Sequence, residues 1–118
     1  MSTDITLSHD EHGVVVLTMA APGQPSVISP QSGRALTQAL REVAAMDGAR
    51  VLVLRSAGKG FNAGGDISAI ESTFADSDRL LGAFIDAFHE AILALRRLPV
   101  PVIGGVHGAA AGGGFSLA

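Results

Sequence analysis

The stretch RVLVLRSAGKGFNAGGD, residues 50–66, joins a near-continuous apolar run to a glycine-rich loop. The apolar part has the composition of a strand buried on both faces, as in a parallel sheet. In the loop, glycines let backbone N–H groups face a ligand with no side chain in the way. The same arrangement recurs at 99–118, where PVPVIGGVHG precedes AAAGGGFSLA and the start of a helix. Two such loops after neighbouring parallel strands predict N–H groups that converge on one oxygen, as in an oxyanion hole.

The residues before this stretch predict the remaining parts of a parallel sheet. The run GVVVLTMA, residues 13–20, is β-branched and is expected to form a strand. Ser29 is placed to cap a helix that begins at Pro30 and stops near the Asp-Gly pair at 47–48. Apolar residues at helical spacing lie between these signals: Ala35, Leu36, Ala39, Leu40 and Val43. The order strand, helix, strand predicts a βαβ crossover.

The residues after the first loop predict two further helices and a third buried strand. Asp66 is placed to cap a short helix that starts at Ile67. A long helix is expected over 78–98, and a third buried strand over 99–108. A wide apolar stripe marks the long helix: Leu80, Leu81, Phe84, Ile85, Phe88, Ile92, Leu93 and Leu95.

Nucleotide-binding motifs fit the glycine-rich loops poorly. GKGFNA, residues 58–63, has the spacing G-x-G-x-x-A, but a Rossmann site needs an acidic residue about 20 positions later at the end of a second strand. That region here is LLGAFIDAF, which is helical in pattern. Lys59 has neither the upstream glycine nor the following Ser or Thr of a P-loop. Ser116 follows GGGF and does not form a G-x-S-x-G elbow. A Rossmann-like nucleotide binder stays as a third alternative.

Composition excludes several classes of function. The 118 residues allow one domain, and a net charge of −3 argues against a nucleic-acid surface. The chain has no cysteine, which excludes disulfides and zinc–thiolate sites. The polar, acidic start MSTDITLSHDEHG lacks the features of a signal peptide and favours a cytoplasmic protein. Hydrophobic residues make up 47% against 16% charged, which indicates apolar faces that meet further chain, another subunit or an apolar ligand.

A membrane span is a weak alternative for the final segment. Residues 99–118 contain His107 as their one ionisable group and a GxxxGxxxG pattern. Pro99 and Pro101 lie inside the window, however, and bulky Leu or Phe side chains are scarce. We therefore expect no membrane partner.

The two glycine-rich segments together resemble a known family. GKGFNAGGDI, residues 58–67, resembles the first signature of the crotonase superfamily (enoyl-CoA hydratases and isomerases), usually G-K/R-x-F-x-A-G-x-D-I/L. PVIGGVHGAAAGGGFSLA, residues 101–118, resembles the second. APGQPSVIS, residues 21–29, is a looser match, with Ser26 where asparagine is usual. The resemblance implies a crotonase-like α/β fold, a ββα superhelix. Residues 1–118 would be its N-terminal part only, a single truncated acyl-CoA-binding core.

The resemblance also implies a site. The family stabilises an enolate-like oxyanion on an acyl-CoA thioester, and the implied donors are the backbone N–H groups of Asn62 and Gly113, with the Asn62 side chain incidental. Residues expected along the acyl-CoA channel or near CoA are Ala63, Gly64, Gly65, Asp66 and Lys59. Asp66 is expected to act mainly as a helix cap, and Lys59 is equally expected to be a solvated surface residue. No metal and no cofactor beyond the coenzyme A of the substrate are expected.

Two side chains near the second loop bear on the reaction. Ser116 stands where hydratases of the family carry a glutamate, and a neutral hydroxyl is too weak a base to replace it. The family's second carboxylate would lie beyond Ala118, so an isomerase-type parent is favoured and the chain as given is expected to be incomplete for catalysis. His107 is interpreted as a hydrogen-bonded structural residue, with a general-base role as the alternative.

Alternatives remain for function and assembly. An enoyl-CoA hydratase, and a non-catalytic acyl-CoA- or protein-binding module, are kept beside the isomerase. By resemblance the protein is expected to form a homo-oligomer, a trimer or hexamer.

Overall fold

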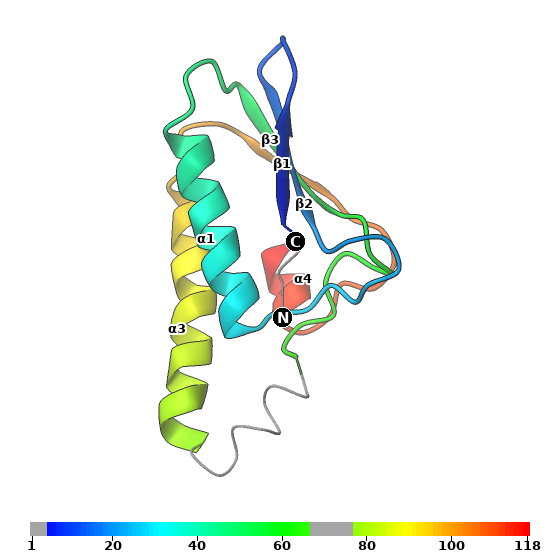
Figure 1. Cartoon of the computed structure of the whole chain (residues 1–118), viewed down its shortest axis with the longest axis vertical. Helices are drawn as coiled ribbons and strands as arrows, with labels where there is room; N and C mark the ends of the chain where they lie inside the picture. Colours follow the sequence, from blue (N-terminus) through cyan, green and yellow to red (C-terminus); the bar gives the residue numbers. More distant parts are fainter. Residues whose placement is uncertain (1–4, 67–76) are drawn as a thin grey trace.

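The computed structural model describes residues 5–66 and 77–118, and within them it shows one four-stranded sheet with helices against one face (Figure 1). The strands lie side by side in chain order: β1 (Thr6–His9), β2 (Val14–Met19), β3 (Val51–Ser56) and β4 (Val102–Gly105). β1 is antiparallel to β2, and the other pairs are parallel. The helices are α1 (Pro30–Ala44), α3 (Ser77–Arg96) and the short α4 (Gly113–Leu117). The predicted βαβ crossover, from β2 through α1 to β3, is therefore confirmed, and β3 and β4 are also parallel.

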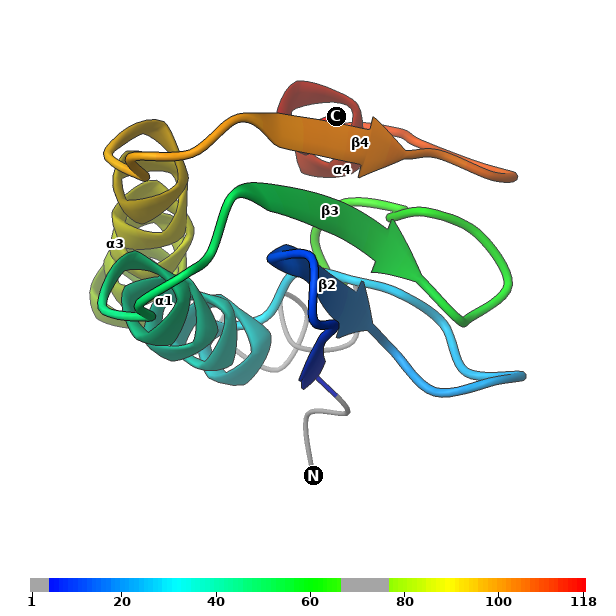
Figure 2. The same ribbon diagram turned by 90° about the horizontal axis from the view of Figure 1, so that it is seen from above.

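The core consists of side chains from β2, β3 and the helices. Figure 2 shows from above how α1 and α3 lie beside the strands. Alternate residues of β2 and β3 are buried, because successive side chains of a strand point to opposite faces. The strands' buried members meet α1 residues, Ala91 of α3 and Leu117 of α4 in one cluster. Its fully buried large side chains are Phe61, Leu17, Leu40, Leu52, Leu54, Val15 and Val43.

Helix α1 begins where the sequence predicts. The Ser29 side chain accepts a hydrogen bond from the N–H of Ser32 at 3.0 Å, and the Ser32 side chain accepts one from the N–H of Ser29 at 2.8 Å. This reciprocal pair is a capping box, which satisfies two helix-end donors. Pro30 occupies the first turn, where its missing N–H costs nothing.

Helix α3 is confirmed, but its apolar stripe is wider than its buried face. Phe84, Ala87 and Ala91 are buried, α3 packs against α1, and Ala91 belongs to the core cluster that contains strand residues. Leu81, Ile85 and Leu93, which the spacing places in the stripe, are exposed at 41%, 53% and 44%. The small residues Ala87 and Ala91 allow close approach of α3, so the buried contact line runs along them. The Leu80 side chain and the expected helix from Ile67 lie outside the described residues.

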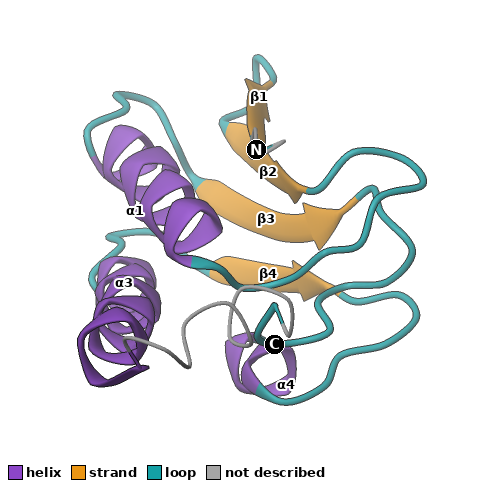
Figure 3. Ribbon diagram, turned by 60° about the horizontal axis from the view of Figure 1, so that its bottom comes forward, coloured by secondary structure: helices purple, strands orange, loops and turns teal. Residues whose placement is uncertain are grey.

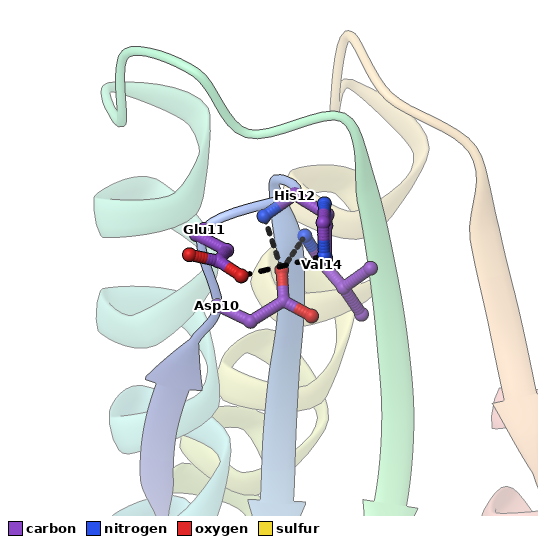
Figure 4. Close-up of polar contacts among 4 residues, drawn as sticks. All are labelled: Asp10, Glu11, His12 and Val14. Carbon is purple, nitrogen blue, oxygen red and sulfur yellow. Dashed lines mark hydrogen bonds and ion pairs between the residues drawn. The ribbon is translucent and has the colours of Figure 1, made fainter.

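Strand β1 was not expected from the polar start of the chain. It pairs with β2 in a hairpin, with Thr6 opposite Thr18 and His9 opposite Val15. At the turn the Asp10 carboxylate accepts hydrogen bonds from the N–H groups of Val14 at 3.0 Å and His12 at 2.9 Å (Figure 4). These bonds hold the Asp10 pKa below its ordinary value, with the Val14 bond as the largest cause. A short polar strand of this kind is defined by pairing and turn contacts, which periodicity does not reveal.

Strand β4 corrects the third strand predicted from 99–108. It covers four residues, and all of them are exposed, so the prediction of a buried strand is wrong for this structure. In the described part of the chain β4 is the edge of the sheet, paired with β3 alone. The apolar residues of β4 are also compatible with a strand at the edge of the sheet that no described residue covers. The described residues also include no helix long and apolar enough to cross a membrane.

Candidate functional site

The two glycine-rich loops lie side by side at one end of the parallel strands, as predicted (Figure 3). The Asn62 N–H donates to the Ala109 carbonyl oxygen at 3.1 Å, and the Ala111 N–H donates to the Asn62 carbonyl oxygen at 3.0 Å. The His107 carbonyl oxygen also accepts from the Phe61 N–H at 2.7 Å. The loops are therefore joined by backbone hydrogen bonds that hold their relative position.

A third segment lines the other side of the first loop. The Ala63 N–H donates to the Ser26 carbonyl oxygen at 2.8 Å. The Ile28 N–H donates to the Gly64 carbonyl oxygen at 2.6 Å, and the Asp66 N–H donates to the Ile28 carbonyl oxygen at 2.7 Å. Residues 62–66 thus run between the 26–28 segment and the second loop.

Glycine at position 64 is required by both conformation and space. Its φ is +92°, in the left-handed region that favours glycine. A Cβ there would also lie 2.9 Å from the Ala111 carbonyl oxygen and 3.4 Å from the Gly113 nitrogen. The two loops can approach this closely only because position 64 carries no side chain.

Among the described residues, the backbone N–H groups of Gly65 and Gly113 have no hydrogen-bond acceptor. Other N–H groups of the two loops share this property, among them those of Gly60, Gly108, Ala109, Ala110 and Gly112.

Both neighbours of Gly65 bond to Ile28. The Gly64 carbonyl oxygen accepts from the Ile28 N–H, and the Asp66 N–H donates to the Ile28 carbonyl oxygen. Within the trans peptide that joins Gly64 to Gly65, the N–H points opposite to the carbonyl, so the Gly65 N–H is directed away from Ile28. The Gly113 nitrogen lies near Gly64, 3.4 Å from the position that a Cβ on Gly64 would take. The two N–H groups therefore belong to backbone segments that lie next to each other.

This geometry corrects two expectations about Asn62. Its backbone N–H is already bonded to Ala109 and is not a free donor, so the prediction that it forms half of an oxyanion hole does not fit. Its side chain is not incidental either, because Oδ1 accepts a hydrogen bond from the Gly64 N–H at 2.9 Å. No sequence signal identifies Gly65, because the directions of these peptide groups depend on the bonds to Ile28 and on the Asn62 side chain.

A cavity of about 610 Å³ lies beside these loops. Asn62, Ala63, Gly65 and Asp66, four of the predicted residues, line it. Its other walls come mainly from the 24–33 segment and from apolar side chains that the sequence did not point to: Ile5, Met19, Ile28, Leu36, Phe88 and Leu117. Such a cavity, mostly apolar with a few polar groups, is typical of a small-molecule site.

The other predicted residues lie outside this lining. Gly64 and Gly113 adjoin it: a Cβ on Gly113 would come 2.7 Å from Ile28 Cδ1 and 3.5 Å from the Phe88 ring, and both side chains line the cavity. Lys59 is exposed, and its place near CoA phosphates stays a prediction.

His107 and Ser116 take positions that bear on their proposed roles. His107 Nε2 lies 2.9 Å from the Gly58 carbonyl oxygen, which agrees with the hydrogen-bonded structural interpretation. Ser116 is exposed on α4. No group of three or more His, Cys, Asp or Glu side chains that could hold a metal ion occurs among residues 5–66 and 77–118.

Known proteins resemble the chain in sequence and in structure. Residues 9–118 match the family described as enoyl-CoA hydratase/isomerase. The chain is 36% identical over 118 residues to 1,2-epoxyphenylacetyl-CoA isomerase of Escherichia coli, covering 98% of this chain and 44% of that protein. It is 35% identical over 121 residues to the fatty acid oxidation complex subunit alpha of Shewanella loihica, covering all of this chain and 17% of that protein.

A crystal structure of an enoyl-CoA hydratase/carnithine racemase from Magnetospirillum magneticum superposes with a TM-score of 0.86 at 29% identity. The match covers 97% of this chain and 42% of that one, so the chain spans less than half the length of these relatives. The family match over nearly the whole sequence and the likeness of fold agree with the two glycine-rich motifs and their arrangement. The chain belongs to the enoyl-CoA hydratase/isomerase family, and its α/β architecture is part of a crotonase-like fold.

Proposed function

We propose that the protein binds an acyl-CoA thioester in the cavity and polarises the thioester carbonyl with the backbone N–H groups of Gly65 and Gly113. The observation that carries the proposal is that these two N–H groups come from two loops that lie next to each other at Gly64 and Gly113, and that neither has an acceptor among the described residues. The adjoining cavity, with its apolar walls, supplies room for an acyl group. Membership of the family supports the thioester as ligand.

The chemistry follows from charge development on the carbonyl oxygen. When a base takes a proton from the carbon next to the thioester, the C–H electron pair is delocalised onto the carbonyl oxygen, and both donors bind the enolate more strongly than the ground state. By the resemblance, this base is a carboxylate that residues 1–118 do not include. Loss of one such donor typically costs about 10²–10³ in rate. Both donors are held by the backbone framework of the loops, so little reorganisation accompanies the reaction.

An isomerase-type reaction fits the side chains better than water addition does. Ser116 is an exposed neutral hydroxyl and cannot activate water as a carboxylate would. Among the described residues that line the cavity, Asp66 is the one carboxylate, so no second carboxylate there is available to share the activation of a water molecule. The Escherichia coli relative is by name an isomerase of an acyl-CoA, which supports the same direction. Hydration and a non-catalytic acyl-CoA-binding role are the alternatives.

The proposal is tested with two reactions and one binding measurement. Octanoyl-CoA is titrated into residues 1–118 by calorimetry. Conversion of a β,γ-enoyl-CoA is compared with hydration of crotonyl-CoA in a protein that extends to the length of its relatives, because residues 1–118 span less than half of that length and are expected to show little or no catalysis alone. We expect octanoyl-CoA to bind and isomerisation to exceed hydration. Robust hydration of crotonyl-CoA would contradict the isomerase proposal. Binding with neither reaction would favour the non-catalytic role, and failure of octanoyl-CoA to bind would contradict the thioester site.

A further inference from the structure

We infer that the Asn62 side chain is a positioning residue, which fixes the direction of the Gly65 N–H towards the bound thioester oxygen. The inference rests on the proposed function, since it concerns how that site is ordered. Asn62 is only 4% exposed, and its Oδ1 accepts from the Gly64 N–H at 2.9 Å. This bond between residues two apart forms an Asx turn, in which a side chain takes the place of a backbone acceptor.

The Asx turn determines which amide is used within the loop and which is available. The Gly64 N–H is turned back onto the Asn62 side chain, and Gly64 adopts its left-handed φ of +92°. The Gly64 carbonyl oxygen accepts from the Ile28 N–H, and the N–H of the same peptide, that of Gly65, therefore points away from Ile28. Without the side-chain acceptor, the Gly64 N–H would lose its partner, and the direction of the next peptide group, which carries the Gly65 N–H, would be less restricted.

The backbone of Asn62 connects this turn to the second donor. Its N–H and carbonyl oxygen bond to Ala109 and Ala111, in the loop that leads directly to Gly113. One residue is thus bonded to the second loop through its main chain and orients the first loop through its side chain. Removal of the side chain leaves both main-chain bonds available, so the positioning role can be separated from loop attachment.

The test compares two ligands that differ at the carbonyl alone. Octanoyl-CoA carries the thioester oxygen, and octyl-CoA, a thioether, lacks it. We expect wild-type protein to bind octanoyl-CoA more tightly, and Asn62→Ala to lower that preference roughly fivefold, as for loss of one neutral hydrogen bond. Octyl-CoA affinity should stay unchanged in the variant, whereas a general loss of structure would weaken both ligands.

A rescue variant and an exchange measurement complete the test. Asn62→Ser keeps a side-chain oxygen that can make the same turn more weakly, so it should restore part of the preference. Without ligand, hydrogen exchange of the Gly64 amide should accelerate in Asn62→Ala and recover in Asn62→Ser. If Asn62→Ala folds poorly, the ligand preference and the Gly64 exchange rate of Asn62→Ser still test the inference.

The outcomes separate the inference from the function on which it rests. Equal wild-type affinities for the two ligands would overturn both the carbonyl site and the positioning role. A wild-type preference for octanoyl-CoA that persists unchanged in Asn62→Ala would overturn the positioning role alone. Equal losses for both ligands in Asn62→Ala and Asn62→Ser would likewise contradict it.

Discussion

The backbone carbonyl oxygen of Asn62 lies in the space that a side chain on Gly114 would occupy. Gly114 is buried in the first turn of α4, and a Cβ there would overlap the carbonyl oxygen, carbon and Cβ of Asn62. The neighbouring atoms are mostly backbone, so they cannot move aside cheaply. The contact explains why the second loop can pack against the first only with glycine at this position.

Gly114→Ala is therefore expected to destabilise the protein and to separate the two loops. Overpacking of this kind costs about 1–3 kcal/mol in the free energy of unfolding, measured by urea denaturation. Octanoyl-CoA binding should weaken as well, because the contact joins Asn62 of the first loop to Gly114, and Gly113 is the residue before Gly114. Unchanged stability would show that the loops are not packed as described.

Gly82→Ala is the matched control. Gly82 lies in α3, and a Cβ there would meet nothing within 4 Å. Replacing glycine by alanine in a helix stabilises it by about 0.5–1 kcal/mol, because alanine loses less conformational freedom on folding. The two glycine substitutions should thus change the unfolding midpoint in opposite directions.

Ser29→Ala is expected to lower the free energy of unfolding by about 1 kcal/mol, since it removes the side-chain acceptor at the start of α1. Ser29→Asn should retain most of the stability, because asparagine caps helices about as well as serine. Urea denaturation of the three proteins measures the difference. If Ser29→Ala and Ser29→Asn lower the free energy of unfolding equally, the change in side-chain size at this buried position would explain the loss, and the capping hydrogen bond would not.

The hairpin turn predicts a dependence of stability on pH. Hydrogen bonds from Val14 and His12 lower the Asp10 pKa in the folded protein from its ordinary 3.8, so folding favours the ionised form. This contribution is fully present above the unfolded-state pKa and is lost as the pH falls through the lower folded-state value. Asp10→Asn keeps an acceptor but does not titrate.

The difference in unfolding midpoint between wild type and Asp10→Asn should therefore be largest near neutral pH and shrink below about pH 4. Other carboxyl groups are common to both proteins and cancel in the comparison. A difference that stays constant over this range would contradict an ionised acceptor at the turn.

The parallel framework could be predicted because its signals are local. The apolar runs at 13–20 and 50–56, the cap at Ser29 and the glycine-rich loops each specify an element without distant contacts. β1 could not be predicted, since its four residues become a strand by pairing with β2. The burial of β4 was predicted wrongly, because an apolar run does not tell which neighbours cover it.

The site could be located from the sequence but not resolved to single amides. Glycine spacing pointed to both loops and to Gly113, and the structure joins the loops through hydrogen bonds. Which N–H of the first loop is available depends on the Asx turn at Asn62 and on the bonds to Ile28. The bonds to Ile28 come from a segment more than thirty residues earlier, and together with the local Asx turn they fix directions of peptide groups that composition cannot show.

Nuclear magnetic resonance of the backbone amides tests the central claim most directly. In a titration of ¹⁵N-labelled protein with octanoyl-CoA, the account predicts downfield proton shifts for the Gly65 and Gly113 amides, because both would donate to the thioester oxygen. The Asn62 amide, bonded to Ala109, should not show such a shift, and octyl-CoA should leave all three in place. A downfield shift of Asn62 without one for Gly65, or the same response to the thioether, would contradict the account.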